Sequence, residues 1–217
     1  MRFFTRYKFV ILLFLLIPIA ALAHGISEED KLRMLSGGYL QYIGLGATHM
    51  LTGYDHLLFL FGVVFFLTSF KDIAKFVTAF TVGHCITLIF ATFYQITWNY
   101  FLIDAIIALS VIYKGFDNNG GFQKYLDMKS PNLLGAVFLF GLLHGFGLST
   151  RLQQLPLGDD STDILLRILS FNLGVEIGQI VALVVMVALL SLWRHKPSFQ
   201  RFSFASNQSL IYAGVLL

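Results

Sequence analysis

The stretch from Tyr39 to Phe70 contains neither lysine nor arginine, and it limits what this chain can fold into more than any other feature. About 20 apolar residues cross the ~30 Å hydrocarbon core of a bilayer as a helix, so this stretch is too long for one ordinary span. Gly53 lies within it, between His49 and Asp55. We expect either a helix that breaks near Gly53 or one long tilted helix. Broken helices occur in transporters where they line a cavity or a binding site.

Further apolar segments follow along the chain: Ile73–Tyr94, Trp98–Tyr113, Leu133–Leu148 and Ile164–Trp193. A last apolar run begins near Ser209 and reaches Leu217. It is too short to cross a bilayer as a helix, so we expect the sequence to end inside a sixth span. Only 12% of the residues are charged, against about 25% in soluble domains, so most of the surface does not face water. The predicted fold class is all-α: a polytopic transmembrane helical bundle of about six spans, formed by residues 38–217.

The N-terminal residues have the pattern of a secretory signal peptide. Basic residues, from Arg2 to Lys8, precede an apolar run over Phe9–Ile19, and Ala21-Leu22-Ala23 supplies a small-x-small cleavage pattern. The alternative is an uncleaved first anchor helix, but the run is short for a span. We therefore predict a cleaved signal peptide over residues 1–23 and a short extracytoplasmic segment over residues 24–37.

The basic residues of the connecting segments indicate the orientation. With the mature N-terminus outside the cytoplasm, eight basic residues fall on the inner side: Lys71, Lys75, Lys114, Lys124, Lys129, Arg194, Lys196 and Arg201. Four fall on the outer side: Lys31, Arg33, Arg151 and Arg167. This asymmetry agrees with the positive-inside rule. The formal net charge of +3 is too small and too dispersed for a nucleic-acid-binding protein, so the lipid bilayer is the expected surrounding.

Ionisable side chains inside predicted spans are expensive, and each is therefore a candidate for function. They are His49, Asp55, His56, His84, Asp104, His144 and Glu176. Neutral imidazoles with a few carboxylates suit Ni²⁺, Co²⁺, Zn²⁺ or Cu²⁺ and suit Mg²⁺ or Ca²⁺ poorly. Cys85 is the only cysteine, which excludes an internal disulfide and a CxxC metal site. We expect a divalent metal ion as the transported substrate and no prosthetic group.

The densest group of these residues is His49-x5-Asp55-His56. On an unbroken helix the two histidines share a face but lie about 10 Å apart along the axis, too far to bind one ion. A break at Gly53 would bring them together, or each would bind an ion with residues of other helices. Asp55 suits either a second ligand or a partner that orients the imidazole.

Two further histidines are candidate ligands. His84 lies on a polar stripe that includes Thr81, and this stripe fits a ligand face or a helix-packing seam equally well. His144 is flanked by glycines, Gly141 and Gly145, that let helices approach closely or open the helix near the imidazole.

Asn172, Glu176 and Gln179 follow one another at i, i+4 and i+7 and share one face of an apolar segment. We expect Glu176 to be a metal ligand and the two amides to support it. Asp104 has no such group around it. It is either a proton-coupling carboxylate or a structural partner of another helix.

These residues resemble those of the HupE/UreJ family of nickel/cobalt permeases, over roughly residues 38–180. The His49-x5-Asp55-His56 segment matches the family's HxxxxxDH motif. Three further strings are similar to family segments: FTVGHCITL (residues 80–88), LHGFG (143–147) and FNLGVE (171–176). The resemblance implies that His49, Asp55 and His56 take part in metal binding and passage, in a multi-pass protein of the bacterial inner membrane. It also implies a second copy of the chain or metalloenzyme-maturation proteins as further partners.

The chain departs from the family at its second motif, FHGx[AV]HGxE. Aligned on His144, it has Phe140 in place of the first histidine and Gly147 in place of the glutamate. Glu176 is a candidate to supply a carboxylate from another helix. A changed ligand set can change the preferred metal, so zinc and copper stay beside nickel and cobalt as candidate substrates.

Two functions therefore compete. One is a permease for a divalent transition-metal ion, most consistent with nickel or cobalt. The other is a haem-binding membrane electron-transfer protein with His84 and His144 as axial ligands. The sequence contains no HExxH, GxSxG or Walker A motif, so we do not expect an enzyme.

Overall fold

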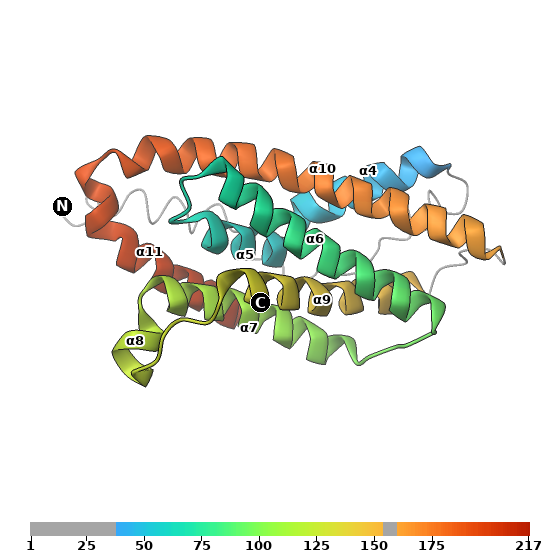
Figure 1. Cartoon of the computed structure of the whole chain (residues 1–217), viewed down its shortest axis with the longest axis horizontal. Coiled ribbons are helices and arrows are strands. Elements are labelled where there is room, and N and C mark those ends of the chain that lie inside the picture. The colour runs from blue at the N-terminus through green and yellow to red at the C-terminus, as the bar shows by residue number, and fades with distance from the viewer. Residues whose placement is uncertain (1–37, 154–159) are drawn as a thin grey trace.

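The computed structural model describes residues 38–153 and 160–217, which form eight α-helices and no strand. These are α4 (Tyr39–Thr52), α5 (Tyr54–Val64), α6 (Phe70–Phe93), α7 (Tyr100–Asn118), α8 (Gly121–Leu126), α9 (Leu133–Leu152), α10 (Ser161–Arg194) and α11 (Pro197–Leu216). The long helices lie along one axis of the molecule, and α8 projects from one corner (Figure 1). The predicted signal peptide and the segment 24–37 lie outside the described residues.

Three of the described helices are long and apolar enough to cross a membrane: Phe70–Phe93, Leu133–Thr150 and Ser161–Arg194. The predicted all-helical fold with membrane-spanning helices is thus confirmed, while the number of six spans stays a prediction. We name the two ends of the bundle by the first and last residues of the α4–α5 pair. At the Tyr39 end, on the right of Figure 1, α4 and α10 begin; at the Val64 end, α5 finishes and α6 and α11 begin.

Capping side chains set where several helices begin. Ser69 accepts a hydrogen bond from the backbone of α6, Asn99 from that of α7, and Asp160 from that of α10. Such caps satisfy N–H groups that the first helical turn leaves unpaired. The helices consequently start a few residues away from the apolar runs that predict them.

The predicted break at Gly53 is confirmed. Gly53 has an extended backbone, with φ −72° and ψ 101°, between α4 and α5. Its N–H closes α4 by donating to the His49 carbonyl, and its carbonyl opens α5 by accepting from the Leu57 N–H. A Cβ atom here would lie 2.7 Å from His56 Nδ1 and 3.0 Å from Asp55 Oδ1. Glycine leaves the room that those side chains occupy.

Glycines bring α4 and α10 into backbone contact as a parallel pair. A Cβ atom on Gly174 of α10 would overlap the Ile43 carbonyl of α4, and one on Gly46 of α4 would overlap the Phe171 carbonyl of α10. Small residues are the usual means of close helix packing in membranes. This pair fixes the position of the first half of the broken helix.

A second close pair is formed by α6 and α9, which run parallel. A Cβ atom on Gly83 of α6 would lie 2.6 Å from the Phe138 carbonyl of α9. Conversely, Gly141 of α9 packs on the backbone of Phe80, and Gly145 of α9 packs on that of His84. This contact brings His84 and His144 onto adjacent turns of two touching helices.

The end of α7 and the start of α11 differ from the sequence prediction. Lys114 was expected in a loop, but α7 continues to Asn118, and Lys114 is buried with its Nζ 2.6 Å from Asp117 Oδ2. The last apolar run was expected from Ser209, but α11 begins at Pro197. Polar side chains of its first turns lower the local hydropathy. There Phe199 packs on Phe65 and Trp193, and from Asn207 to Gly214 the helix packs on α7.

Polar contacts tie the helices together at both ends of the bundle. At the Val64 end, Arg194 of α10 donates to the carbonyls of Val64 and Phe65, which α5 leaves without intrahelical partners (2.8 Å to Phe65). At the Tyr39 end, Asp163 of α10 accepts from Tyr39 at 2.9 Å and pairs with Arg167 at 2.6 Å. Between these two sets of contacts, the interior of the bundle holds His56, His84 and His144.

Candidate metal site

Asp55 and His56 of α5 and His144 of α9 meet in the interior of the bundle. Each offers one ligand atom, and the three atoms lie within 4.8 Å of one another. All three residues are buried, with exposed fractions of 2%, 6% and 2%. We call these three residues the central cluster. Within the described ranges, no other group of at least three His, Cys, Asp or Glu residues converges in this way.

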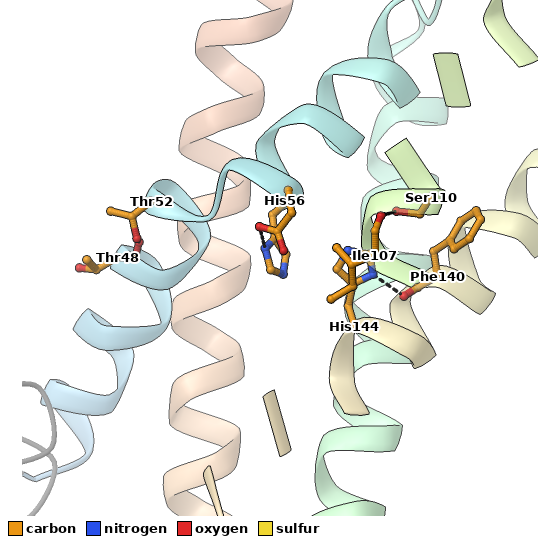
Figure 2. Close-up of polar contacts among 8 residues, drawn as sticks. Thr48, Thr52, His56, Ile107, Ser110, Phe140 and His144 are labelled. Carbon is orange, nitrogen blue, oxygen red and sulfur yellow. Dashed lines mark hydrogen bonds and ion pairs between the residues drawn. The ribbon is translucent and has the colours of Figure 1, made fainter. Parts of the chain in front are cut away.

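The break in the helix places the first two members. Asp55 and His56 fall in the first turn of α5, directly after Gly53. His56 Nδ1 lies 2.9 Å from Asp55 Oδ1, the dashed contact beside His56 in Figure 2. The carboxylate accepts the Nδ1 proton and so directs the other ring nitrogen, Nε2, away from itself. A carboxylate that orients an imidazole in this way is common behind metal-binding histidines.

His144 is oriented by its own helix. Its Nδ1 lies 2.7 Å from the carbonyl of Phe140, one turn earlier in α9 (Figure 2). A carbonyl only accepts, so Nδ1 carries the proton and the neutral ring presents a bare Nε2. That Nε2 atom is buried and has no hydrogen-bond partner among the described residues.

His49 lies beside the central cluster, on the last turns of α4. Its ring and that of His56 meet edge to face, with centroids 5.1 Å apart. The expectation that a break at Gly53 brings the two histidines together is therefore confirmed. The His49 ring also contacts the ring of Phe171 of α10, with centroids 5.7 Å apart.

The remaining histidine candidate, His84, is buried but lies outside the central cluster. Its Nδ1 is 3.0 Å from Asn172 Oδ1 of α10. The neighbouring Thr81 donates to Gln179 Oε1 at 2.9 Å. The two amides of α10 thus contact α6, whereas the sequence had paired them with Glu176 of their own helix.

The two other candidate carboxylates are placed differently. Glu176 is half-buried on α10. Asp104 is half-buried on α7. Neither belongs to the convergent group of the described residues.

Aromatic rings, which the sequence analysis did not single out, wall the cluster. Phe80 of α6 contacts the rings of His56 and His144, with centroids 6.4 and 5.1 Å away, and Phe59 of α5 contacts His144 at 5.9 Å. A cavity of about 10 Å³, near the size of one water molecule, lies beside His56 and is otherwise lined almost wholly by apolar side chains and Gln179. The spacing of Phe80 and His84, one helical turn apart, was the available signal for this wall.

Comparison with known proteins decides the family. A family model described as HupE / UreJ protein matches residues 27–217, which is most of the chain. The chain belongs to the HupE/UreJ family. We found no match among curated proteins or among solved structures. HupE/UreJ proteins are membrane transport and accessory proteins rather than enzymes, in agreement with the long apolar helices.

The structure shows what surrounds Phe140 and Gly147, the two positions at which the sequence differs from the second motif expected by resemblance. The backbone carbonyl of Phe140 orients His144. A Cβ atom on Gly147 would lie 2.9 Å from Ile103 Cγ2 of α7. A side chain at position 147 would therefore require Ile103 to shift.

Proposed function

We propose that this chain is a permease that carries a divalent transition-metal ion across the membrane, and that the central cluster binds the ion on its way. The observation that carries the proposal is the convergence of Asp55, His56 and His144 in the interior of a helical bundle. Two imidazole nitrogens and a carboxylate oxygen are borderline ligands that suit late first-row divalent metals. Membership of the family favours nickel or cobalt, with zinc and copper as alternative substrates.

Burial supports a binding role for these residues. An ionisable side chain inside a membrane is costly unless it is paired or serves the passage of an ion. Asp55 supplies a negative charge that offsets part of the charge of a divalent cation. The hydrogen bonds to His56 and His144 hold both imidazoles in place before the ion arrives, which lowers the entropic cost of binding.

Access of an ion to the central cluster requires a movement of the helices, because polar contacts hold both ends of the bundle together. The central cluster is closed off from the surface, so the ion reaches it only when helices separate on one side. The α4–α10 and α6–α9 pairs are each held by backbone contacts, and α5 follows α4 directly after Gly53. We propose that the two pairs move as units about α5, in a chain whose mature N-terminus is outside the cytoplasm.

The haem alternative fits the geometry poorly. His84 and His144 lie on α6 and α9, and a Cβ atom on Gly145 would already lie 2.5 Å from the His84 carbonyl. A porphyrin between two axial histidines needs facing helices that stand apart. These two helices touch, so no space remains for a macrocycle between them.

Metal accumulation in cells that lack their own nickel uptake tests the proposal. Cells with the unmodified chain should accumulate more Ni²⁺ or Co²⁺ than cells without it. His56→Ala, His144→Ala and Asp55→Asn should each lower the accumulation about tenfold or more, since ligands and their orienting partners typically matter 10–100-fold. His195→Ala is the matched control, because His195 is exposed at the end of α10. Equal accumulation of Ni²⁺, Co²⁺, Zn²⁺ and Cu²⁺ with and without the chain would refute the proposed function.

A further inference from the structure

His84 is a buried imidazole that the central cluster does not include. His84 is only 1% exposed and lies on the face of α6 that points into the bundle. The ring of Phe80, one turn earlier, stacks on it with centroids 6.2 Å apart. The same Phe80 ring contacts His56 and His144. His84 is therefore separated from the central cluster by one aromatic side chain.

Asn172 determines which nitrogen of His84 carries the proton. The Asn172 Nδ2 amide donates to the Ile168 carbonyl at 2.9 Å, and a carbonyl cannot donate in return. The amide oxygen Oδ1 therefore faces His84 and can only accept. At 3.0 Å it accepts the proton of Nδ1. The neutral ring consequently has an unprotonated Nε2.

This Nε2 atom is buried and has no hydrogen-bond partner among the described residues. His144 shows the same arrangement, with Nδ1 held by a carbonyl and a bare, unpartnered Nε2. Buried polar atoms are nearly always satisfied, so an orphan lone pair points to a group that binds there. Two such lone pairs occur on helices that touch each other.

A packing role accounts less well for His84. Thr87 lies one turn further on the same stripe and shows what packing looks like: its hydroxyl donates to the Leu142 carbonyl of α9 at 2.7 Å. The Thr87 hydroxyl thus forms a hydrogen bond between α6 and α9. His84 uses only Nδ1 in this way, and among the described residues its Nε2 has no hydrogen-bond partner.

We propose that His84 is an additional ligand of the transported ion, and that Asn172 is the positioning residue that presents its Nε2 lone pair. This inference rests on the proposed function. His84 reaches the ion when the Phe80 ring, which lies against all three imidazoles, rotates aside. Changes of side-chain rotamer of this kind commonly accompany binding.

Cobalt(II) bound to the purified full-length chain in detergent provides the probe. An imidazole that binds Co²⁺ through Nε2 and keeps its Nδ1 proton gives an exchangeable, strongly shifted proton resonance. His84→Gln should remove one such resonance and weaken cobalt binding about 10–100-fold. Asn172→Leu should do the same, and the double variant should lose no more than either single one, because both changes remove the same ligand.

Two further variants separate positioning from mere support of the fold. Asn172→Asp keeps an oxygen that accepts the Nδ1 proton, so the resonance should remain. Asn207→Leu is the matched control: Asn207 is buried, and its amide also donates to a carbonyl four residues earlier, that of Ser203, but it lies on α11 and its oxygen accepts from Asn118. It should leave all shifted resonances and the affinity unchanged.

The outcomes that overturn the inference differ from those that overturn the function. If His56→Ala abolishes cobalt binding but His84→Gln keeps every resonance and full affinity, His84 is not a ligand, and the permease proposal stands. If His84→Gln loses a resonance and Asn172→Leu does not, Asn172 does not position it. If the unmodified chain binds no cobalt and does not change metal accumulation in cells, both proposals fail.

Discussion

The imidazoles of His49 and His56 meet edge to face with ring centroids 5.1 Å apart. On an unbroken helix these two residues would lie about 10 Å apart along the axis. The difference comes from Gly53, whose extended backbone separates α4 from α5. The helix break at Gly53 thus brings His49 and His56 together beside Asp55.

We predict that Gly53→Ala disturbs metal binding more than folding. The added Cβ atom would lie 2.7 Å from His56 Nδ1, so the imidazole must shift and its bond to Asp55 weakens. Metal affinity of the purified chain, measured by titration calorimetry, should fall about 10–100-fold. Gly135→Ala on α9 is the control, since the nearest atom to its Cβ would be 3.8 Å away. Unchanged affinity in Gly53→Ala would mean that the break does not position the ligands.

Much of the fold can be predicted from the sequence, because the length of an apolar run indicates whether it can span the membrane. The stretch around Gly53 shows this: its excess length and its glycine predicted the break that the structure has. The exceptions lie where polar and apolar residues mix. Lys114 was placed in a loop because a lysine at the end of an apolar run usually reaches water, whereas here Asp117 pairs with it inside the bundle.

The candidate site was predicted residue by residue but not as an assembly. A single sequence gives the face of each helix, not the register between helices. It therefore suggested that Asn172 supports Glu176, four residues away, whereas Asn172 contacts His84 of α6. In the same way, nothing in the spacing of α9 revealed that His144, rather than His84, would join Asp55 and His56.

The α4–α10 contact should be highly sensitive to side-chain size. Gly174→Ala places a methyl group into the Ile43 carbonyl, and such overpacking costs typically about 1–3 kcal/mol. Gly44→Ala on α4 has nothing within 4 Å of the new Cβ and should leave stability unchanged or slightly raised. The free energy of unfolding in mixed detergent measures both. Equal stability of the two variants would contradict the backbone contact between these helices.

The buried pair of Lys114 and Asp117 should respond asymmetrically to substitution. Asp117→Asn leaves the Lys114 ammonium buried without a counter-charge, and breaking a buried pair costs about 3–5 kcal/mol. Lys114→Met in the same chain removes that charge and should restore most of the loss. The same unfolding measurement tests this. A double variant no more stable than Asp117→Asn alone would show that the charge is not the source of the loss.

Transport by the purified chain in liposomes tests the metal-permease function most directly. Vesicles that hold a metal-sensitive fluorophore and contain the unmodified chain should take up Ni²⁺ or Co²⁺ faster than empty vesicles. Vesicles with His56→Ala or His144→Ala should take it up no faster than empty ones, and vesicles with His195→Ala should match the unmodified chain. Uptake at the rate of the unmodified chain after loss of both His56 and His144 would contradict a passage through the central cluster.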